Sequence, residues 1–306
     1  MTAPLCYNYP WHALPDSLYP RVAREYLDYG VDTFVFSDPL IKACIADPER
    51  LSFLRCFTRR MGVKFVATHS PFGSTYDLNI PEAERRPVML KDHVRAMAIS
   101  AEFGAKTYTM HVGAYHHCTK HIPVQDLRPN AIASLEHLLP YAEKLGIVIA
   151  VENSFEPTNS AKEVYDLVKQ FDSSPAIGVC YDTGHAHFMA PYPWKKREKY
   201  ASYQNNSWWE NGIIEEANAL ETLQDYVVTT HIHDNTGYSD LHSMPFDGTI
   251  DWDELMPKLF NCPRILEHQT EINFSDGSGW AGQALAPTGG YSIKSQVETF
   301  RKLGFN

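Results

Sequence analysis

Short runs of β-branched, aromatic and other apolar residues alternate with longer amphipathic stretches along the whole chain. Runs of this kind predict buried β-strands, and the amphipathic stretches between them predict helices. One helical stretch, residues 128–146, closes with Gly146, a residue type that commonly follows the last helical turn. The expected strands are Leu5–Tyr9, Thr33–Ser37, Lys64–Thr68, Thr107–Met110, Val148–Val151, Ile177–Tyr181, Val227–His231 and Arg264–Leu266.

The spacing of these strands indicates the fold. From Ser37 onward the strand ends recur at residues 69, 111, 152, 182, 231 and 267, at intervals of 30 to 49 residues. Each interval has room for one strand, one helix and two loops. Eight such units make an α/β protein of the (β/α)8 type, a TIM barrel, and 306 residues fit a single domain of this class. An open, doubly wound sheet is the structural alternative.

Two segments are longer than simple connections. Residues 191–212, PYPWKKREKYASYQNNSWWENG, are aromatic and partly basic, and residues 270–291 are rich in Gly and Ser. In a barrel both would lie over the catalytic face, where long loops are commonly functional. Trp194, Trp208 and Trp209 are therefore candidates for a lid or for stacking against a substrate. The alternative is a surface excursion, or a contact between subunits of a homo-oligomer.

The composition narrows the functional classes. Lysine and arginine number 27 against 37 aspartates and glutamates, and this net charge of -10 argues against a nucleic acid partner. The six cysteines are scattered without a CxxC pair, as expected of buried thiols in a reducing compartment. The N-terminal residues lack the pattern of a signal peptide, and no apolar run reaches the ~18 residues of a membrane span. We therefore expect a cytoplasmic protein without a membrane partner.

Residues with metal-binding side chains follow most of the expected strands. A divalent ion is held by carboxylate oxygens and imidazole nitrogens that converge from different elements. A parallel barrel brings such groups together because all of its strands point their C-terminal ends at the same face. The densest stretch, residues 227–252, supplies several of these side chains after one β-branched run. The candidate metal ligands are His69, His111, Glu152, Asp182, His185, His231, Asp240, His242 and Glu267.

At these positions the chain resembles the xylose-isomerase-like TIM barrels, which include sugar and sugar-phosphate isomerases and epimerases and the endonuclease IV type of abasic-site nuclease. The resemblance covers nearly the whole chain. In the ketose epimerases of this group, two glutamates, an aspartate and a histidine hold one divalent ion. Matched motif by motif, these are Glu152 of VEN, Asp182 of DTGH, His231 of HIHD and Glu267 of ILE. The resemblance also implies that His185 contacts the substrate or the ion.

The endonuclease IV branch binds three zinc ions, and the resemblance of this chain to that branch implies further metal ligands. Its further ligands match His69 of HSPF, His111 of MHVG, His185, and Asp240 with His242 of DLH. The resemblance thus implies one to three divalent ions per chain, of manganese, zinc, cobalt or magnesium. One departure from the isomerase-like pattern is Asp247 before Gly248, where those members often have Gly-x-Gly. The remaining histidines near these motifs, interpreted as surface or supporting residues, are His116, His117, His187, His233 and His268.

The ligand set indicates a reaction class. A ketose or aldose bound to a cation through its carbonyl and a neighbouring hydroxyl has an acidic α-proton, because the cation stabilises the enediolate. In the epimerases that the chain resembles, the two metal-bound glutamates move this proton, which implies Glu152 and Glu267 as the acid/base pair. True xylose isomerases, which shift a hydride, have a lysine in a KPxEP-like motif at the fifth strand. Residues 152–157 read ENSFEP here. Proton transfer is therefore the expected route.

Several functions remain open at this point. We expect a metal-dependent isomerase or epimerase that acts on a small-molecule carbohydrate. An endonuclease IV-type phosphodiesterase has the complete ligand set in its favour and the acidic charge against it. A lyase or dehydratase acting on a keto-sugar would share the enolate chemistry, and a non-catalytic sugar-binding barrel would not need so many ligands.

The basic cluster Lys195–Lys199 could contact a phosphate, DNA or only solvent. Residues 277–282, GSGWAG, fit G-x-G-x-x-G but open no βαβ unit, so they do not indicate a dinucleotide site.

Overall fold

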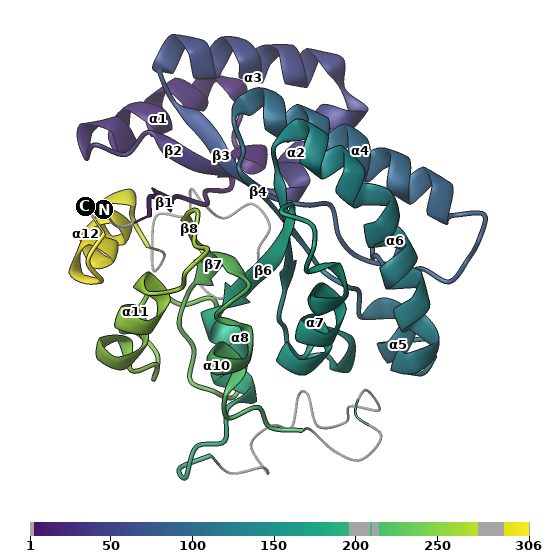
Figure 1. The fold of residues 1–306 in the computed structure, drawn as a ribbon. Helices are drawn as coiled ribbons and strands as arrows, with labels where there is room; N and C mark the ends of the chain where they lie inside the picture. Colours follow the sequence, from purple (N-terminus) through teal and green to yellow (C-terminus); the bar gives the residue numbers. More distant parts are fainter. Residues whose placement is uncertain (1–2, 196–208, 210–213, 275–290, 306) are drawn as a thin grey trace.

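The computed structural model describes residues 3–195, 209, 214–274 and 291–305. Its strands form one parallel sheet in the order β1-β8-β7-β6-β5-β4-β3-β2 (Figure 1). The strands are β1 (Leu5–Cys6), β2 (Thr33–Phe36), β3 (Lys64–His69), β4 (Thr107–Met110), β5 (Val148–Glu152), β6 (Ile177–Asp182), β7 (Val227–Ile232) and β8 (His268–Thr270). The arrangement confirms the predicted (β/α)8 fold class.

A short link between β1 and β2 nearly closes the sheet. Tyr7 forms an isolated parallel bridge with Phe34 just after β1. The Tyr7 N–H donates to the Thr33 carbonyl at 3.0 Å, and the Val35 N–H donates to the Tyr7 carbonyl at 3.1 Å. The doubly wound alternative, in which the two edges stay apart, is therefore excluded. A closed parallel barrel has a single C-terminal rim, and this rim is where such barrels place their active sites.

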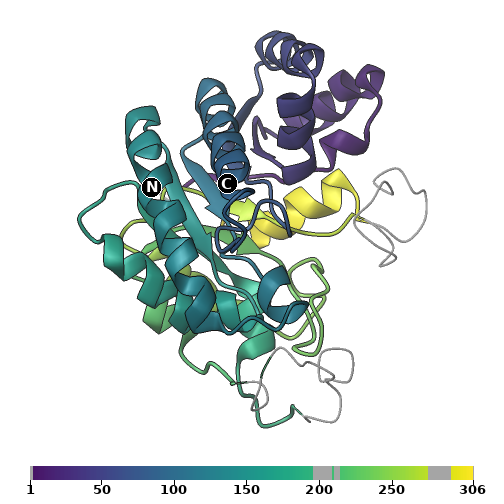
Figure 2. The ribbon, with the colours of Figure 1, turned by 90° about the vertical axis from the view of Figure 1, so that its right-hand side faces the viewer.

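Helices surround the barrel in chain order (Figure 1). The long helices α4 and α6 lie side by side, which is also visible from the second direction (Figure 2). None of the helices in the described part of the chain is long and apolar enough to cross a membrane. The helices are α1 (Tyr19–Asp28), α2 (Asp38–Ala46), α3 (Pro48–Met61), α4 (Arg86–Phe103), α5 (Tyr115–Cys118), α6 (Val124–Leu145), α7 (Ala161–Val168), α8 (Thr183–Met189), α10 (Ala219–Leu223), α11 (Trp252–Phe260) and α12 (Ile293–Lys302).

Apolar side chains pack on both faces of the sheet. Large residues of the strands, such as Phe34, Phe65 and Ile149, belong to the main core between the sheet and the helices. Successive side chains of a strand point to opposite faces, so the residues between them face the inside of the barrel. These residues are small and form two clusters, Cys6 with Val35 and Ala67, and Ala150 with Cys180 and Val228. The barrel interior is thus a narrow packed core, which leaves the rim for chemistry.

Seven of the eight strands are confirmed, and the eighth was predicted in the wrong place. β8 covers His268–Thr270 instead of Arg264–Leu266. Its residues can be polar and buried because they find hydrogen-bond partners inside the fold. Gln269 Nε2 donates to Thr229 Oγ1 at 3.0 Å, and Gln296 Nε2 donates to Thr270 Oγ1 at 3.0 Å. The apolar Ile265 and Leu266 only lead into the strand. The end of the eighth strand therefore moves from residue 266 to residue 270.

The two long segments are only partly within the described residues. Trp208, most of residues 191–212 and residues 275–290 lie outside them. Trp194 stacks on Tyr192 with ring centroids 5.0 Å apart, and Trp209 Nε1 donates to the Phe155 carbonyl at 3.3 Å. The predicted lid or stacking role of these tryptophans stays a prediction.

Candidate metal centre

The C-terminal rim of the barrel contains a pocket of about 480 Å³. Its apolar lining includes Phe72, Phe155, Ile272 and Phe274. Its polar lining includes His69, His111, Glu152, His185, Asp240, His242 and Glu271. Six of these seven polar residues were singled out from the sequence. A mostly apolar pocket with a few converging polar groups is typical of a small-molecule site.

Four buried side chains form the centre of the site. His231 Nδ1 lies 2.8 Å from Glu271 Oε2, 3.1 Å from Glu152 Oε1 and 3.8 Å from Asp182 Oδ2. Glu152 and Asp182 end β5 and β6, His231 lies near the end of β7, and Glu271 directly follows β8. Ligand atoms of all four residues lie within 4.8 Å of one another. We call Glu152, Asp182, His231 and Glu271 the tetrad.

A first flanking group shares a residue with the tetrad. It consists of His69, at the end of β3, His111, just after β4, and Glu152. Glu152 Oε2 lies 3.0 Å from His111 Nε2 and 3.7 Å from His69 Nε2. Its other oxygen, Oε1, faces His231. The Glu152 carboxylate therefore bridges the two groups.

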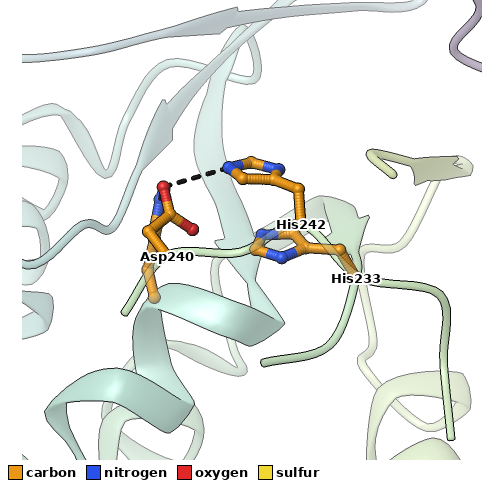
Figure 3. Close-up of side chains that lie close together, drawn as sticks. His233, Asp240 and His242 are labelled. Atoms are coloured by element: carbon orange, nitrogen blue, oxygen red, sulfur yellow. Dashed lines mark hydrogen bonds and ion pairs between the residues drawn. The ribbon is translucent and has the colours of Figure 1, made fainter. Parts of the chain in front are cut away.

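A second flanking group lies on the other side of the tetrad. It consists of His185, Asp240 and His242, and His233 lies beside them. Figure 3 shows His233 with Asp240 and His242. Asp240 Oδ2 is 3.0 Å from His242 Nε2 and 3.5 Å from His185 Nε2. Asp182 connects this group to the tetrad, because its Oδ1 accepts the His185 N–H at 2.7 Å as the N-cap of α8. The helix thus begins on one candidate ligand and presents the next within its first turn.

Backbone carbonyls orient three of these imidazoles. Nδ1 of His69 lies 3.0 Å from the Ser70 carbonyl, Nδ1 of His185 lies 3.0 Å from the Asn153 carbonyl, and Nδ1 of His242 lies 2.8 Å from the Glu271 carbonyl. A carbonyl can only accept, so Nδ1 carries the proton in each neutral ring and Nε2 keeps a lone pair. Each Nε2 points toward a carboxylate of the site. This is the arrangement of metal-binding histidines in general.

The electrostatics of the cluster also suit divalent cations. Burial opposes protonation of His111, but the Glu152 carboxylate outweighs it and raises the pKa of His111 to about 9. Asp240 likewise overcomes burial and raises the pKa of His242 to about 9. Within the described residues, the buried Asp240 Oδ1 has no hydrogen-bond partner. Carboxylates this crowded need positive charge, which protons on the histidines or bound cations can supply.

Glu267 is not part of the cluster. It precedes β8, and its Oε1 accepts hydrogen bonds from Thr107 Oγ1 and from Gln269 Nε2. Thr107 is the first residue of β4, whereas His111 directly follows the last one. The two positions are four residues apart along the strand, roughly 13 Å at ~3.3 Å per residue. Because Glu267 bonds Thr107, it lies near the end of the barrel opposite to the rim. The candidate metal groups of the described residues do not include Glu267, so the structure does not support its expected role as a metal ligand and acid/base residue. Glu271 lies where Glu267 was expected.

Two residues of the site were missed from the sequence. Glu271 was hidden by the wrong position of β8, although EHQTE holds two glutamates four residues apart. His233 lies two residues after His231, and this spacing puts both side chains on the same side of an extended segment. The other four histidines interpreted from the sequence as surface or supporting residues are buried, and they do not belong to the candidate metal groups of the described residues. They are His116, His117, His187 and His268.

Comparison with known proteins identifies the family. Residues 24–286 match the model of the xylose isomerase-like TIM barrel. The chain belongs to this family. The predicted resemblance is thus confirmed over most of the sequence.

Sequence relatives of the chain include two uncharacterised proteins. y4fM of Sinorhizobium fredii is 26% identical over 179 residues, which are 58% of this chain and 49% of that protein. MJ1311 of Methanocaldococcus jannaschii is 24% identical over 225 residues, 69% of this chain and 65% of that protein. The chain therefore spans less than two thirds of the length of these relatives. Apurinic-apyrimidinic endonuclease 1 of Plasmodium berghei is 27% identical over 143 residues, 44% of this chain and 26% of that protein.

Solved structures with the same fold include sugar epimerases. A D-tagatose 3-epimerase-like protein has a TM-score of 0.64 at 19% identity, over 92% of this chain and 90% of that one. The 3-keto-D-glucoside 4-epimerase YcjR from E. coli has a TM-score of 0.65 at 15% identity, over 99% of both chains. The zinc-bound IOLI protein has a TM-score of 0.64 at 16% identity, over 99% of this chain and 96% of that one. At these identities the likeness establishes the fold alone.

Proposed function

We propose that this protein is a divalent-metal-dependent isomerase or epimerase of a sugar or sugar derivative. The observation that carries the proposal is the position of two carboxylates. Glu152 and Glu271 both line the pocket, and they lie 3.1 Å and 2.8 Å from His231. Asp182 and His231 belong to the same tetrad but are not among the lining residues. Glu152 and Glu271 are thus the two tetrad residues that a bound substrate would meet.

The proposed reaction is proton transfer next to a carbonyl. A divalent ion held by the tetrad, which could be manganese, zinc, cobalt or magnesium, would polarise the substrate carbonyl and stabilise the enediolate. Glu152 and Glu271 come from β5 and from the end of β8, so they reach the substrate from different sides. One carboxylate can remove the α-proton and the other can return a proton to the opposite face, which inverts the centre. His185, which also lines the pocket, is placed to contact a substrate hydroxyl.

The similar structures support this choice of reaction class. The names of two of them describe a D-tagatose 3-epimerase-like protein and a 3-keto-D-glucoside 4-epimerase, and a third holds zinc. Both of the named epimerisations take place beside a carbonyl group, which is the chemistry that two carboxylates at an ion site can perform. A carbohydrate is therefore the proposed substrate of this chain.

The direct test is the exchange of a substrate proton with solvent. The protein is loaded with manganese, cobalt or zinc and incubated in heavy water with a panel of ketoses and keto-acids, and the α-proton signal is followed by NMR. We expect loss of this signal for at least one compound. Product analysis then separates an isomerase from a lyase or dehydratase, because elimination expels a leaving group, which is water for a dehydratase, and leaves an unsaturated product instead of an isomer.

Two matched variants test the roles of the glutamates. Glu271→Gln should slow the exchange by roughly 10²- to 10⁴-fold, the usual contribution of a general acid or base. Glu267→Gln makes the same chemical change four residues away, outside the pocket, and should leave the exchange rate unchanged. Full exchange by a folded, metal-loaded Glu271→Gln protein would contradict the proposal.

Hydrolysis of a phosphodiester is a second candidate because of one specific observation. The tetrad is flanked by two further ligand groups, and Glu152 bridges to one of them. Several ions close together can clamp a phosphate and activate water. The similarity to the Plasmodium berghei endonuclease supports this candidate, and the net charge of -10 opposes it. Cleavage of an abasic-site duplex by the zinc-loaded protein would favour it, and absence of binding at low salt would remove it.

A further inference from the structure

We infer that His233 is a positioning residue that holds Asp182 and His242 in place and so connects the tetrad to the second flanking group. The inference rests on the metal centre of the proposed function. His233 is fully buried and directly follows β7. It lies within the candidate ligand group of His185, Asp240 and His242. Its geometry indicates that it supports the ligands and does not bind an ion itself.

The first contact of His233 is with Asp182. His233 Nε2 lies 3.0 Å from Asp182 Oδ1 and 2.9 Å from Asp182 Oδ2. A carboxylate accepts hydrogen bonds, so Nε2 carries the proton and donates it. Asp182 Oδ1 also accepts the backbone N–H of His185. These two donors fix the plane of the Asp182 carboxylate and direct its remaining lone pairs toward His231.

The second contact of His233 is with His242. The two rings are stacked, with centroids 3.9 Å apart and an interplanar angle of 11° (Figure 3). The lone pair of an imidazole nitrogen lies in the plane of its ring. Two parallel rings in separate planes therefore cannot both direct lone pairs at one ion. Because His242 Nε2 faces Asp240, His242 is the ligand of this pair and His233 supports its face.

The start of α8 is built around His233. Thr183 Oγ1 donates to the His233 carbonyl at 2.7 Å and accepts the His233 N–H at 3.1 Å. A Cβ at position 184 would lie 2.1 Å from His233 Cε1 and 2.5 Å from its Nδ1, so only glycine fits there. The second ring nitrogen of His233 thus faces Gly184, and His233 is not among the lining residues of the pocket. Three consecutive residues therefore contact His233: Asp182 and Gly184 lie against its side chain, and Thr183 bonds its backbone.

Removal of the N–H donor should weaken the ion held by the tetrad. Residues that orient metal ligands typically change affinity by roughly 10- to 100-fold when they are replaced. His233→Phe keeps a ring that can stack on His242 but has no donor for Asp182. We expect its affinity for Co²⁺ or Zn²⁺ to fall by that factor, as measured by competition with a chromophoric chelator. The comparison is made in proteins that also carry Asp240→Asn, which removes a candidate ligand of the second flanking group. The affinity of the tightest remaining site is then that of the tetrad.

Two further variants separate positioning from general stability. His233→Gln places an amide N–H near the position of Nε2, and it should restore most of the affinity. His268→Phe removes another buried histidine that bonds a hydroxyl, Thr230 Oγ1 at 2.8 Å, outside the metal groups. It should lower stability without changing ion affinity. The visible spectrum of the Co²⁺ protein should change for His233→Phe and not for His268→Phe, because only the former alters the coordination by Asp182.

The outcomes are distinguishable from those of the proposed function. Equal ion affinity in the wild type and in His233→Phe would overturn the role of His233. The role would also be overturned if a folded His233→Gln protein bound the ion no more tightly than His233→Phe. If His233→Phe does not fold, the comparison of His233→Gln with Gly184→Ala decides, since a methyl group at position 184 must displace the ring and should weaken binding. Failure of the wild type to bind ions would overturn the inference together with the metal centre. A metal-loaded protein without solvent exchange would contradict only the proposed reaction.

Discussion

At the scale of single residues, two glutamates four positions apart show how much the environment decides. Glu271 lies beside His231, whose charge outweighs the cost of burial and lowers the pKa of the Glu271 carboxyl. Glu267 is equally buried, but its hydrogen-bond partners are neutral, and burial raises its pKa to about 7. The first carboxyl is therefore suited to bind a cation, and the second is half protonated at neutral pH.

This difference predicts how the stability of a Glu267→Gln variant depends on pH. The folded-state pKa of Glu267 lies above the unfolded value of about 4.5, so the folded state binds its proton more tightly. The stabilisation that the protonated Glu267 gives to the folded state is fully present below about pH 4.5. It is lost as the pH rises through 7, and the total loss in the free energy of unfolding is up to roughly 3 kcal/mol. Glutamine cannot ionise, so the variant should gain stability relative to the wild type between pH 5 and 8. Urea unfolding with a chelator present measures this, and a difference independent of pH would contradict it.

At the scale of elements, the loop between β7 and α11 is organised by Asp234. Its carboxylate accepts the backbone N–H groups of Phe246 and Ile250 at 3.0 and 3.2 Å and the indole N–H of Trp252 at 2.8 Å. A Cβ at Gly248 would lie 2.1 Å from Asp234 Oδ1, which explains the glycine in the FDGTIDW motif. The loop that carries Asp240 and His242 is thus closed around one carboxylate.

Asp234→Asn should loosen this loop. The amide keeps the size of the side chain but has no charge and only one acceptor oxygen, and hydrogen bonds to charged groups contribute about 1.5–3 kcal/mol each. We expect a loss of roughly 2 kcal/mol in the free energy of unfolding and faster proteolysis within residues 235–250. Asp251→Asn is the matched control, because Asp251 is the N-cap of α11 and asparagine caps equally well. Equal effects of the two substitutions would contradict the central role of Asp234.

At the scale of the whole molecule, the candidate metal centre joins residues from β3 to β8. Its candidate ligands come from six strand ends or the loops that follow them, so an ion that binds only the folded state would stabilise the entire barrel. The overall charge of -10 favours cation binding in addition.

Removal of ions should therefore lower the melting temperature. An ion at 100 times its Kd stabilises by about 2.7 kcal/mol, which corresponds to a rise in melting temperature of roughly 4 °C for a chain of this size. Thermal unfolding with a chelator and with increasing Zn²⁺ or Co²⁺ measures this shift. The Glu271→Gln variant, which lacks a tetrad carboxylate, should show a smaller shift, and Glu267→Gln should behave like the wild type. A melting temperature insensitive to these ions would contradict the metal centre.

The sequence by itself determined the fold class, seven of the strands and most of the rim residues. It could do so because a buried strand of a parallel barrel is apolar and short, and because a ligand at its end interrupts that pattern abruptly, as at His69, Glu152 and Asp182. Family resemblance then supplied the expected grouping of these side chains. Both signals are local in the chain.

Only the tertiary structure decided between Glu267 and Glu271 and revealed the place of His233. β8 is polar because Gln269 and Thr270 find partners on β7 and α12, and a pattern of apolar residues cannot register such long-range bonds. His233 is recognisable only by what it contacts, a carboxylate from β6 and a ring from the following loop. A buried polar side chain can bind an ion, orient another ligand or only form hydrogen bonds within the core. Which of these it does depends on neighbours that are distant in sequence, and those are set when the barrel closes.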